Sequence, residues 1–399
     1  MRLSALVPVL VAAGLLWPAA AEAQQVRIQP EVGLEARVFP QGPRRQEQVE
    51  TFQGSVILTG EGRWTSRDRR TRVRIEPYAR LDSADEERRY LDLREASLSL
   101  RRGDWDLLAG VGQVFWGVAE SRNVVDVINQ FDTIEDIDEG EKLGQPMLRL
   151  SRRGGFGVIE AFYLPFFRER LFPGEEGRLR SDPVVDTEEA RYERDGREWA
   201  GDFALRYANR FGDFDLGVHG FYGTSRNPVL EFNPETGRLD PFYRELVQGG
   251  VDLQYTSGPW LLKGEAVGAG IAGDAFASSV AGFEYTFFDL AESGIDLGVI
   301  GEYLYDGRDQ DTAPVSLFEN DAFVGTRVTF NDVQDTEILA GAIIDTETAA
   351  IQASIEFQRR IGDNMLLEIE ARSFTASGDP FIESLDRDDY VTLRFTRFF

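Results

Sequence analysis

Apolar and polar residues alternate with a period of two over segments of about ten residues along most of the chain. In residues 51–64 the even positions carry apolar side chains and glycines, and the odd positions are mostly polar or charged. Residues 72–81, 199–211 and 351–358 repeat the pattern. Successive side chains of a strand point to opposite faces, so each segment predicts a strand with one apolar and one polar face. Helical periodicity is absent.

Short and long connections alternate between these predicted strands. The tight turns, rich in Gly, Asp, Asn or Pro, are expected at 66–70, 102–104, 153–155, 211–213, 257–259, 292–294, 332–335 and 362–364. The longer polar connections are 39–50, 82–88, 116–145, 167–196, 225–243, 270–274, 306–317, 345–349 and 377–387. Eight turns and nine loops predict 18 antiparallel strands. Segments 146–152 and 275–290 are weak strands, which leaves 16 strands as the fallback.

The N-terminus has the features of an export signal. Met1-Arg2 precedes an apolar stretch over 3–17, and Ala21-Glu22-Ala23 has the small-x-small pattern of a cleavage site. We expect residues 1–23 to be removed and 24–399 to form one domain. No later segment has the roughly 20 apolar residues that a membrane helix needs.

An exported chain without a membrane helix is either soluble or a closed barrel, because lipid tolerates only paired backbone groups. A soluble, secreted β-sandwich or repeat protein is the alternative. Aromatic residues near predicted strand ends, such as Trp64, Trp105, Trp260 and Tyr303, favour the barrel, where they would form interfacial girdles. The sequence therefore predicts an all-β, transmembrane, antiparallel up-and-down β-barrel in a bacterial outer membrane, with short periplasmic turns and long extracellular loops.

The C-terminal strand and the net charge suggest partners. The chain ends on Phe399 after apolar residues at alternate positions, which resembles the C-terminal signal that the barrel-assembly machinery reads. Arg397 departs from that pattern, where a hydrophobic residue is usual. Outer-membrane lipid and lipopolysaccharide would surround such a barrel. A formal net charge of -26 argues against nucleic acid, whose phosphates would be repelled.

One stretch carries a family resemblance. Residues 93–100, 103–107 and 112–113, followed by Trp116-Gly117 and 124–132, form the matching pattern. They resemble an uncharacterised, domain-of-unknown-function family of proteobacterial outer-membrane, porin-like β-barrels. The match covers about forty residues. It implies a fold and a location, but no substrate.

Catalytic and metal chemistry have little support. The chain has no cysteine and one histidine, which leaves no Cys/His zinc site. His219 shares its strand face with Asp213 and Asp215, so it is either a general base or a histidine hydrogen-bonded on the inner wall. A Gly-x-Ser-x-Gly nucleophile motif is absent. We expect no enzyme, no cofactor and no metal.

The polar strand faces supply candidate pore-lining residues. They are Glu61, Arg63, Arg72, Arg74, Glu76, Arg80, Asp202, Arg206, Arg210, Glu368, Glu370 and Arg372, with Glu356 and Arg394 in the same ladder. A barrel of this size leaves a water-filled interior, where such charges would act on passing solutes. Alternatively, they pair with one another and only solvate the wall.

The long connection 116–145 is both acidic and apolar. It holds eight carboxylates against Arg122 and Lys142, a local charge of -6, and seven aliphatic or aromatic side chains. We expect it to fold into the lumen as a constriction, with an external cap as the alternative. Asp126, Asn129 and Asp132 recur every three residues and would share one face of a short helical turn, pointing at the pore axis.

These features together predict a passive or weakly selective channel for the diffusion of small hydrophilic solutes. The alternative is a barrel that serves an envelope transport system for lipids or hydrophobic compounds. Composition and spacing fix neither the solute nor the oligomeric state.

Overall fold

The computed structural model describes residues 25–399 except 136, 272, 310–312, 315, 317, 376, 377 and 379. The expected leader and its cleavage site at 1–23 lie outside the described residues. No described helix is long and apolar enough to cross a membrane.

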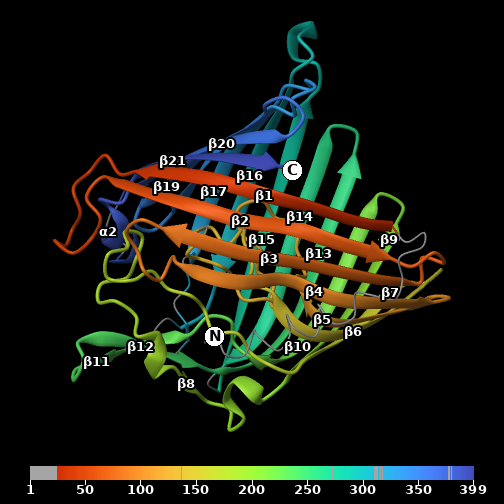
Figure 1. Cartoon of the computed structure of the whole chain (residues 1–399), viewed down its shortest axis with the longest axis horizontal. Coiled ribbons are helices and arrows are strands. Elements are labelled where there is room, and N and C mark those ends of the chain that lie inside the picture. The colour runs from red at the N-terminus through yellow and green to blue at the C-terminus, as the bar shows by residue number, and fades with distance from the viewer. Residues whose placement is uncertain are drawn as a thin grey trace.

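Eighteen antiparallel strands form one closed barrel (Figure 1). They are β1(Gln25–Val38), β2(Phe52–Thr65), β3(Thr71–Asp82), β4(Tyr90–Arg102), β5(Trp105–Gly112), β6(Gln145–Gly154), β7(Gly157–Leu164), β9(Asp202–Phe211), β10(Phe214–Thr224), β13(Glu245–Ser257), β14(Trp260–Ile271), β15(Asp274–Phe287), β16(Asp296–Asp306), β17(Asn320–Thr329), β18(Glu337–Asp345), β19(Ile351–Arg360), β20(Met365–Thr375) and β21(Tyr390–Phe398). Each pairs with the next along the chain, and β21 returns to β1 with Glu31 opposite Phe398 and Val38 opposite Val391. The predicted barrel and its 18 strands are confirmed, since the weak segments form β6 and β15.

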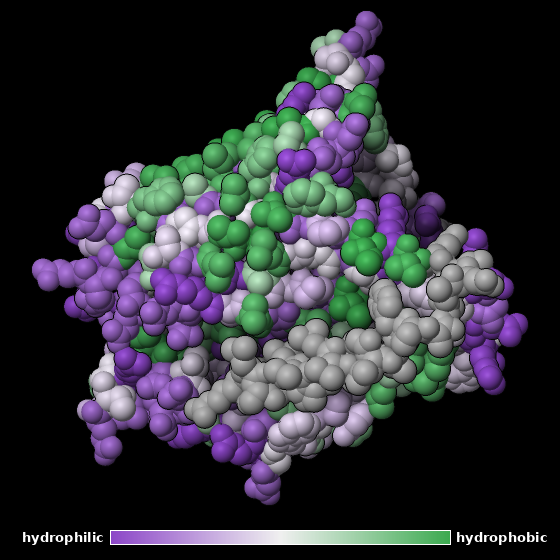
Figure 2. Space-filling view, viewed as in Figure 1, coloured by the Kyte–Doolittle hydropathy of each residue, from purple (hydrophilic) through white to green (hydrophobic). Residues whose placement is uncertain are grey.

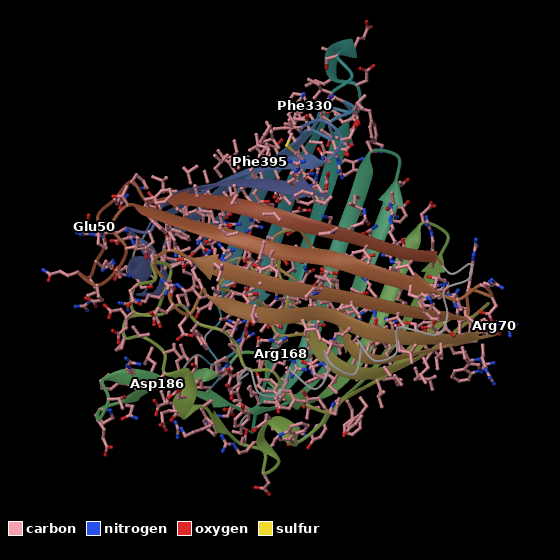
Figure 3. All side chains as sticks on the ribbon, in the orientation of Figure 1. Glu50, Arg70, Arg168, Asp186, Phe330 and Phe395 are labelled. Carbon is pink, nitrogen blue, oxygen red and sulfur yellow. The ribbon has the colours of Figure 1, made fainter. Side chains whose placement is uncertain are left out.

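Long and short connections lie at opposite ends of the barrel, as the alternation predicts. The long-loop end carries Glu50 and Asp186, and the short-turn end carries Arg70 (Figure 3). Several tight turns need a glycine in the left-handed region, such as Gly103 (φ 56°) and Gly212 (φ 64°). The long loops add a small sheet of β8(Arg191–Tyr192), β11(Val229–Asn233) and β12(Arg238–Tyr243), the 3-10 helices Thr187–Glu189 and Arg197–Trp199, and the helix α2(Pro380–Leu385). A further described 3-10 helix, Leu290–Glu292, lies in the short turn between β15 and β16.

Three predicted boundaries were wrong. The segment 270–274 is not a long loop, because β14 continues to Ile271 and β15 begins at Asp274. Trp199 does not start a strand; it ends a 3-10 helix, and β9 begins at Asp202. The connection after β5 begins at 113, three residues before the predicted 116, because β5 ends at Gly112. In each case the strand begins or ends where its ladder of backbone hydrogen bonds does. Alternation of apolar and polar residues alone does not mark that position.

The outer face of the barrel is apolar. Leu58, Leu205, Val247 and Leu393 are 44%, 57%, 54% and 46% exposed, although they are large aliphatic side chains within strands. Figure 2 shows such side chains gathered over β20, β21 and β1, with hydrophilic ones at the loop end. An exposed apolar belt of this extent is unfavourable in water and suits contact with lipid.

Candidate functional site

The connection 113–144 between β5 and β6 is closed at its neck by one buried asparagine. The side-chain oxygen of Asn129 accepts a hydrogen bond from the Val114 amide at 2.9 Å. Its amide nitrogen donates to the Gly112 and Leu143 carbonyls at 2.9 and 2.8 Å. One side chain therefore joins the two ends of this segment, which we call the inner loop (residues 113–144).

The apolar residues of the inner loop pack against inward-facing side chains of the barrel wall. Val125 and Ile128 are fully buried, and they share a cluster with Phe162 of β7, Phe221 of β10 and Val267 of β14. Burying an aliphatic side chain of this size contributes about 1.5–3 kcal/mol. These contacts explain how an acidic loop can also carry so many apolar residues.

Two wall carboxylates hold the inner loop by its backbone. They are Glu265 of β14 and Glu302 of β16, which are 3% and 5% exposed. Glu265 accepts hydrogen bonds from the amides of Val118, Ala119, Val124 and Val125 at 2.6–3.4 Å, and Glu302 accepts from Glu120 and Ser121 at 2.7 and 2.8 Å. A hydrogen bond to a charged group contributes roughly 1.5–3 kcal/mol. These six amides would otherwise lack partners at the wall.

The bend after Trp116 requires a glycine. Gly117 has φ 107°, and a Cβ there would lie 2.1 Å from Asn123 Oδ1 and 2.7 Å from Glu265 Oε1. Trp116 beside it packs on His219, with ring centroids 5.1 Å apart. His219 Nε2 lies 3.2 Å from the side-chain nitrogen of Gln248, and no described carboxylate forms a hydrogen bond with this imidazole. The geometry favours the inner-wall histidine over the general base.

An ionic network fixes the far side of the inner loop. Glu135 binds Tyr78 and Arg80 of β3 and Arg394 of β21. Arg80 also binds Glu35 of β1, and its side chain is fully buried. Burial opposes ionisation of Glu135, but Arg80 and Arg394 outweigh it and lower its pKa to about 2. This contribution to stability is therefore present above the ordinary pKa of 4.5 and is lost as the pH falls toward 2.

The expected face of Asp126, Asn129 and Asp132 is not present. The segment forms turns and bends instead of a helix. Each of the three side chains has its own partner: Asn129 bonds at the neck, Asp132 bonds to the wall, and Asp126 bonds to another residue of the inner loop. Asp132 binds Arg94 and accepts from the Tyr90 hydroxyl at 2.6 Å, and Asp126 binds Lys142. Burial raises the pKa of Asp126 and lowers that of Lys142, while their mutual attraction opposes both shifts. All three side chains serve the packing of the inner loop.

The predicted pore-lining residues fall into three groups. Arg72 and Arg210 are exposed near the short-turn end. Most of the others form ion pairs: Arg74 with Glu61, Glu76 and Glu95; Arg63 with Glu61; Arg80 with Glu35 and Glu135; Asp202 with Arg194 and Arg226; and Arg206 with Asp252. Glu368, Glu370 and Arg372 line a cavity.

Three adjoining cavities separate the inner loop from part of the wall. The vestibule, about 350 Å³, lies among the long loops and is bordered by Arg122, Phe131 and Phe318. The middle cavity, about 280 Å³, shares Arg122, Phe131 and Glu139 with it. The inner cavity, about 370 Å³, shares Glu120, Glu356 and Arg372 with the middle one. The shared linings place the three cavities next to one another, from the long-loop end into the barrel.

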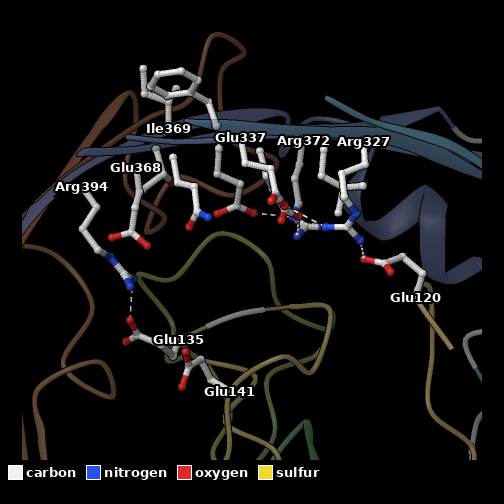
Figure 4. Close-up of a pocket in the computed structure, with 15 residues that line it drawn as sticks. Glu120, Glu135, Glu141, Arg327, Glu337, Glu368, Ile369, Arg372 and Arg394 are labelled. Atoms are coloured by element: carbon white, nitrogen blue, oxygen red, sulfur yellow. Dashed lines mark hydrogen bonds and ion pairs between the residues drawn. The ribbon is translucent and has the colours of Figure 1, made fainter. Parts of the chain in front are cut away.

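The inner cavity is strongly acidic. β17 to β21 form one side and the inner loop the other, with Arg394 reaching Glu135 and Arg327 reaching Glu120 across the gap (Figure 4). Its charged lining is Glu120, Glu135, Glu141, Glu337, Glu356, Glu368 and Glu370 against Arg327, Arg372 and Arg394. Burial opposes ionisation of Glu120, but Lys263 and Arg327 outweigh it and lower its pKa. No group of described His, Cys, Asp and Glu side chains is arranged to hold a metal ion.

Sequence reasoning missed Glu265 and Glu302, and with them Arg327 and Glu337. A signal was present in the alternation. Lys263 and Glu265 lie on the inward-facing side of β14 among apolar residues, and Glu302 lies among apolar residues on the inward-facing side of β16. A single carboxylate on a mostly apolar inner face needs a partner, which marks it as a contact point for another segment.

The chain matches no protein-family model and no curated protein. Its fold is similar to that of solved outer-membrane proteins. The BenF-like porin of Pseudomonas fluorescens Pf-5 superposes with a TM-score of 0.55 at 8% identity, covering 95% of this chain and 98% of its own. For OpdQ of Pseudomonas aeruginosa the values are 0.53, 10%, 95% and 98%, and for the outer-membrane protein OpdK of the same organism 0.50, 10%, 94% and 98%. The likeness shows a porin-type barrel, and the resemblance to an uncharacterised family stays a prediction.

Proposed function

We propose that the chain forms a channel in the bacterial outer membrane through which small hydrophilic solutes diffuse passively. The observation that carries this function is the series of three adjoining cavities between the inner loop and the wall of a closed barrel. A charged inner cavity bounded by a folded loop suits diffusion of hydrated solutes. Catalysis has no part in this proposal.

The apolar outer belt and the porin-type fold support the membrane location. In this proposal residues 1–23 are removed on export, and 24–399 form the single barrel domain. Phe399, which is 63% exposed at the end of β21, is available to the barrel-assembly machinery. Lipid and lipopolysaccharide then cover the outer face.

The inner loop is the constriction of the proposed channel. Its apolar side packs against β7, β10 and β14. Its carboxylates Glu120, Glu135 and Glu141 face the wall of β17 to β21 across the inner cavity. Solutes would therefore pass on that side of the barrel. This arrangement replaces Asp126, Asn129 and Asp132 as the residues at the narrowest part.

The acidic inner cavity is expected to make the channel prefer cations. Carboxylates that line a narrow passage concentrate cations and exclude anions. Reversal potentials of the purified protein in planar bilayers, measured across a salt gradient, should show cation selectivity. The selectivity should fade with salt, because the Debye length falls from ~10 Å at 0.1 M to ~3 Å at 1 M.

Matched variants locate the source of this preference. Glu356→Gln combined with Glu368→Gln should move the reversal potential toward zero, since both residues line the inner cavity. Glu231→Gln removes a carboxylate from β11 among the external loops and should leave it nearly unchanged. Anion selectivity at low salt would contradict the proposed path, and an absence of conductance would contradict the channel itself.

A further inference from the structure

Arg122 differs from the other basic side chains around the cavities, because its buried guanidinium is poorly satisfied. The residue is 8% exposed, and its Nε and Nη1 atoms have no hydrogen-bond partner among the described residues. Its contacts are Glu139, 3.7 Å from Nη1, and the ring of Phe318, 4.6 Å from the guanidinium carbon. Glu139 is already bound to Arg170 at 2.8 Å. A buried cation in this state costs free energy unless another group completes its hydrogen bonds.

The place of Arg122 in the fold gives such a group access. The residue borders both the vestibule and the middle cavity. Each of the other vestibule arginines has a close partner: Arg170 binds Glu139, Arg226 binds Asp202, Arg308 binds Asp306, and Arg180 binds the Ser181 carbonyl. Only the Nε atoms of Arg170 and Arg180 lack a hydrogen bond among these four described side chains, whereas Arg122 lacks one at both Nε and Nη1. Arg122 is thus the vestibule arginine best able to take an added anion.

The vestibule is otherwise largely apolar. Its lining includes Val127, Phe131, Ile137, Phe276 and Phe318. Arginines there outnumber carboxylates, with Asp126, Glu139 and Asp306 as the acidic members. The charge balance is therefore opposite to that of the inner cavity, and the walls offer contacts that a small hydrated ion would not use.

We infer that the vestibule is a binding site for an amphipathic monoanion, whose charged head pairs with Arg122 and whose apolar body packs on Phe131, Phe276 and Phe318. A guanidinium supplies several donors to one oxyanion, and apolar walls favour a ligand that brings apolar surface with it. The site rests on the proposed function, because the vestibule is the mouth of the proposed channel. The acidic cavity beneath would retain such an anion at the mouth.

Calorimetric titration of the protein in lipid nanodiscs tests this site without any current. The probes are hexanoate, acetate with the same head and a shorter body, and hexylammonium with a similar alkyl body and the opposite charge; empty nanodiscs give the background. Hexanoate should bind at least about tenfold more tightly than acetate, because each buried methylene adds affinity. It should also bind at least about tenfold more tightly than hexylammonium, because Arg122 attracts an anion and repels a cation. Arg122→Gln should weaken hexanoate by at least about tenfold, since it removes the charge pair. Arg308→Gln, in the same vestibule, should leave the affinity within about twofold, because that arginine is already paired with Asp306.

Three outcomes would overturn the inference. Equal binding of acetate would mean a small-anion site, and equal binding of hexylammonium would mean an apolar surface without a charge contact. Unchanged affinity in a folded Arg122→Gln barrel, checked by its heat-modifiable gel shift, would remove Arg122 from the site. Binding of hexanoate to a protein without conductance would reject the proposed channel and keep this site, so the two can fail separately.

Discussion

Replacing Glu265 and Glu302 together with alanine is expected to raise single-channel conductance severalfold. These carboxylates accept six backbone hydrogen bonds from residues 118–125 of the inner loop. Without them the amides would stay buried without partners, at a cost of roughly 1–3 kcal/mol each. The segment should therefore leave the wall for water, and the path that it narrows should widen.

Two further variants separate this effect from a general change of charge. Glu284→Ala removes a carboxylate of β15 that faces Lys263 and Arg327 and accepts no inner-loop amide, so conductance should stay near that of the unmodified protein. The double glutamine variant of Glu265 and Glu302 keeps one of the two acceptor oxygens of each side chain and should give an intermediate conductance. Equal conductance in the double alanine variant and the unmodified protein would show that these residues do not hold the inner loop.

Replacing Arg80 with methionine is expected to destabilise the barrel by about 3–5 kcal/mol. The Arg80 side chain is fully buried between Glu35 and Glu135, so its loss leaves two buried carboxylates without their main counter-charge. Urea unfolding in lipid vesicles measures the change. Arg63→Met is the matched control: its pair with Glu61 is 49% exposed on the arginine side, and exposed pairs contribute about 0–1 kcal/mol.

Adding Glu35→Gln and Glu135→Gln to Arg80→Met should recover part of the lost stability. The recovery is expected because the two carboxylates no longer need a counter-charge in a buried site. An Arg80→Met variant that is no less stable than Arg63→Met would rule out a structural role for this network.

The barrel could be predicted from sequence because alternation and turn chemistry are local signals. Residues 51–64 show both faces of β2 directly, and Gly212 with Asp213 marks the turn between β9 and β10 without reference to distant residues. Every strand repeats the same two-residue period, so the count survives errors of a few residues at strand ends.

The interior could not be predicted to the same extent, because the contacts there join residues far apart in the sequence. Parity placed Arg80 on the inner face, but did not show that Glu135, 55 residues later, would bury it. The same holds for Glu265 and the Ala119 amide, 146 residues apart. The polar face of β2 was expected to meet water, yet Ser55 is 6% exposed and bonded to Asp82.

The motif with the family resemblance has a structural explanation. Gly117 allows the bend that brings the loop to Glu265, Asn129 closes the neck, and Asp132 binds Arg94. These residue types serve the packing of one loop. A spacing of three between Asp126, Asn129 and Asp132 suggested a helix, but tertiary contacts determined each position separately.

In the proposed channel the inner loop lies in the path of solutes and narrows it. The most direct test is the single-channel conductance of a variant in which residues 122–140 are replaced by a short glycine-serine linker, with the heat-modifiable gel shift confirming a folded barrel. A markedly larger conductance than that of the unmodified protein is expected, since most of the loop side of the middle cavity and Glu135 of the inner cavity are removed. An unchanged conductance in the folded variant would contradict it, because the loop would then lie outside the conducting path.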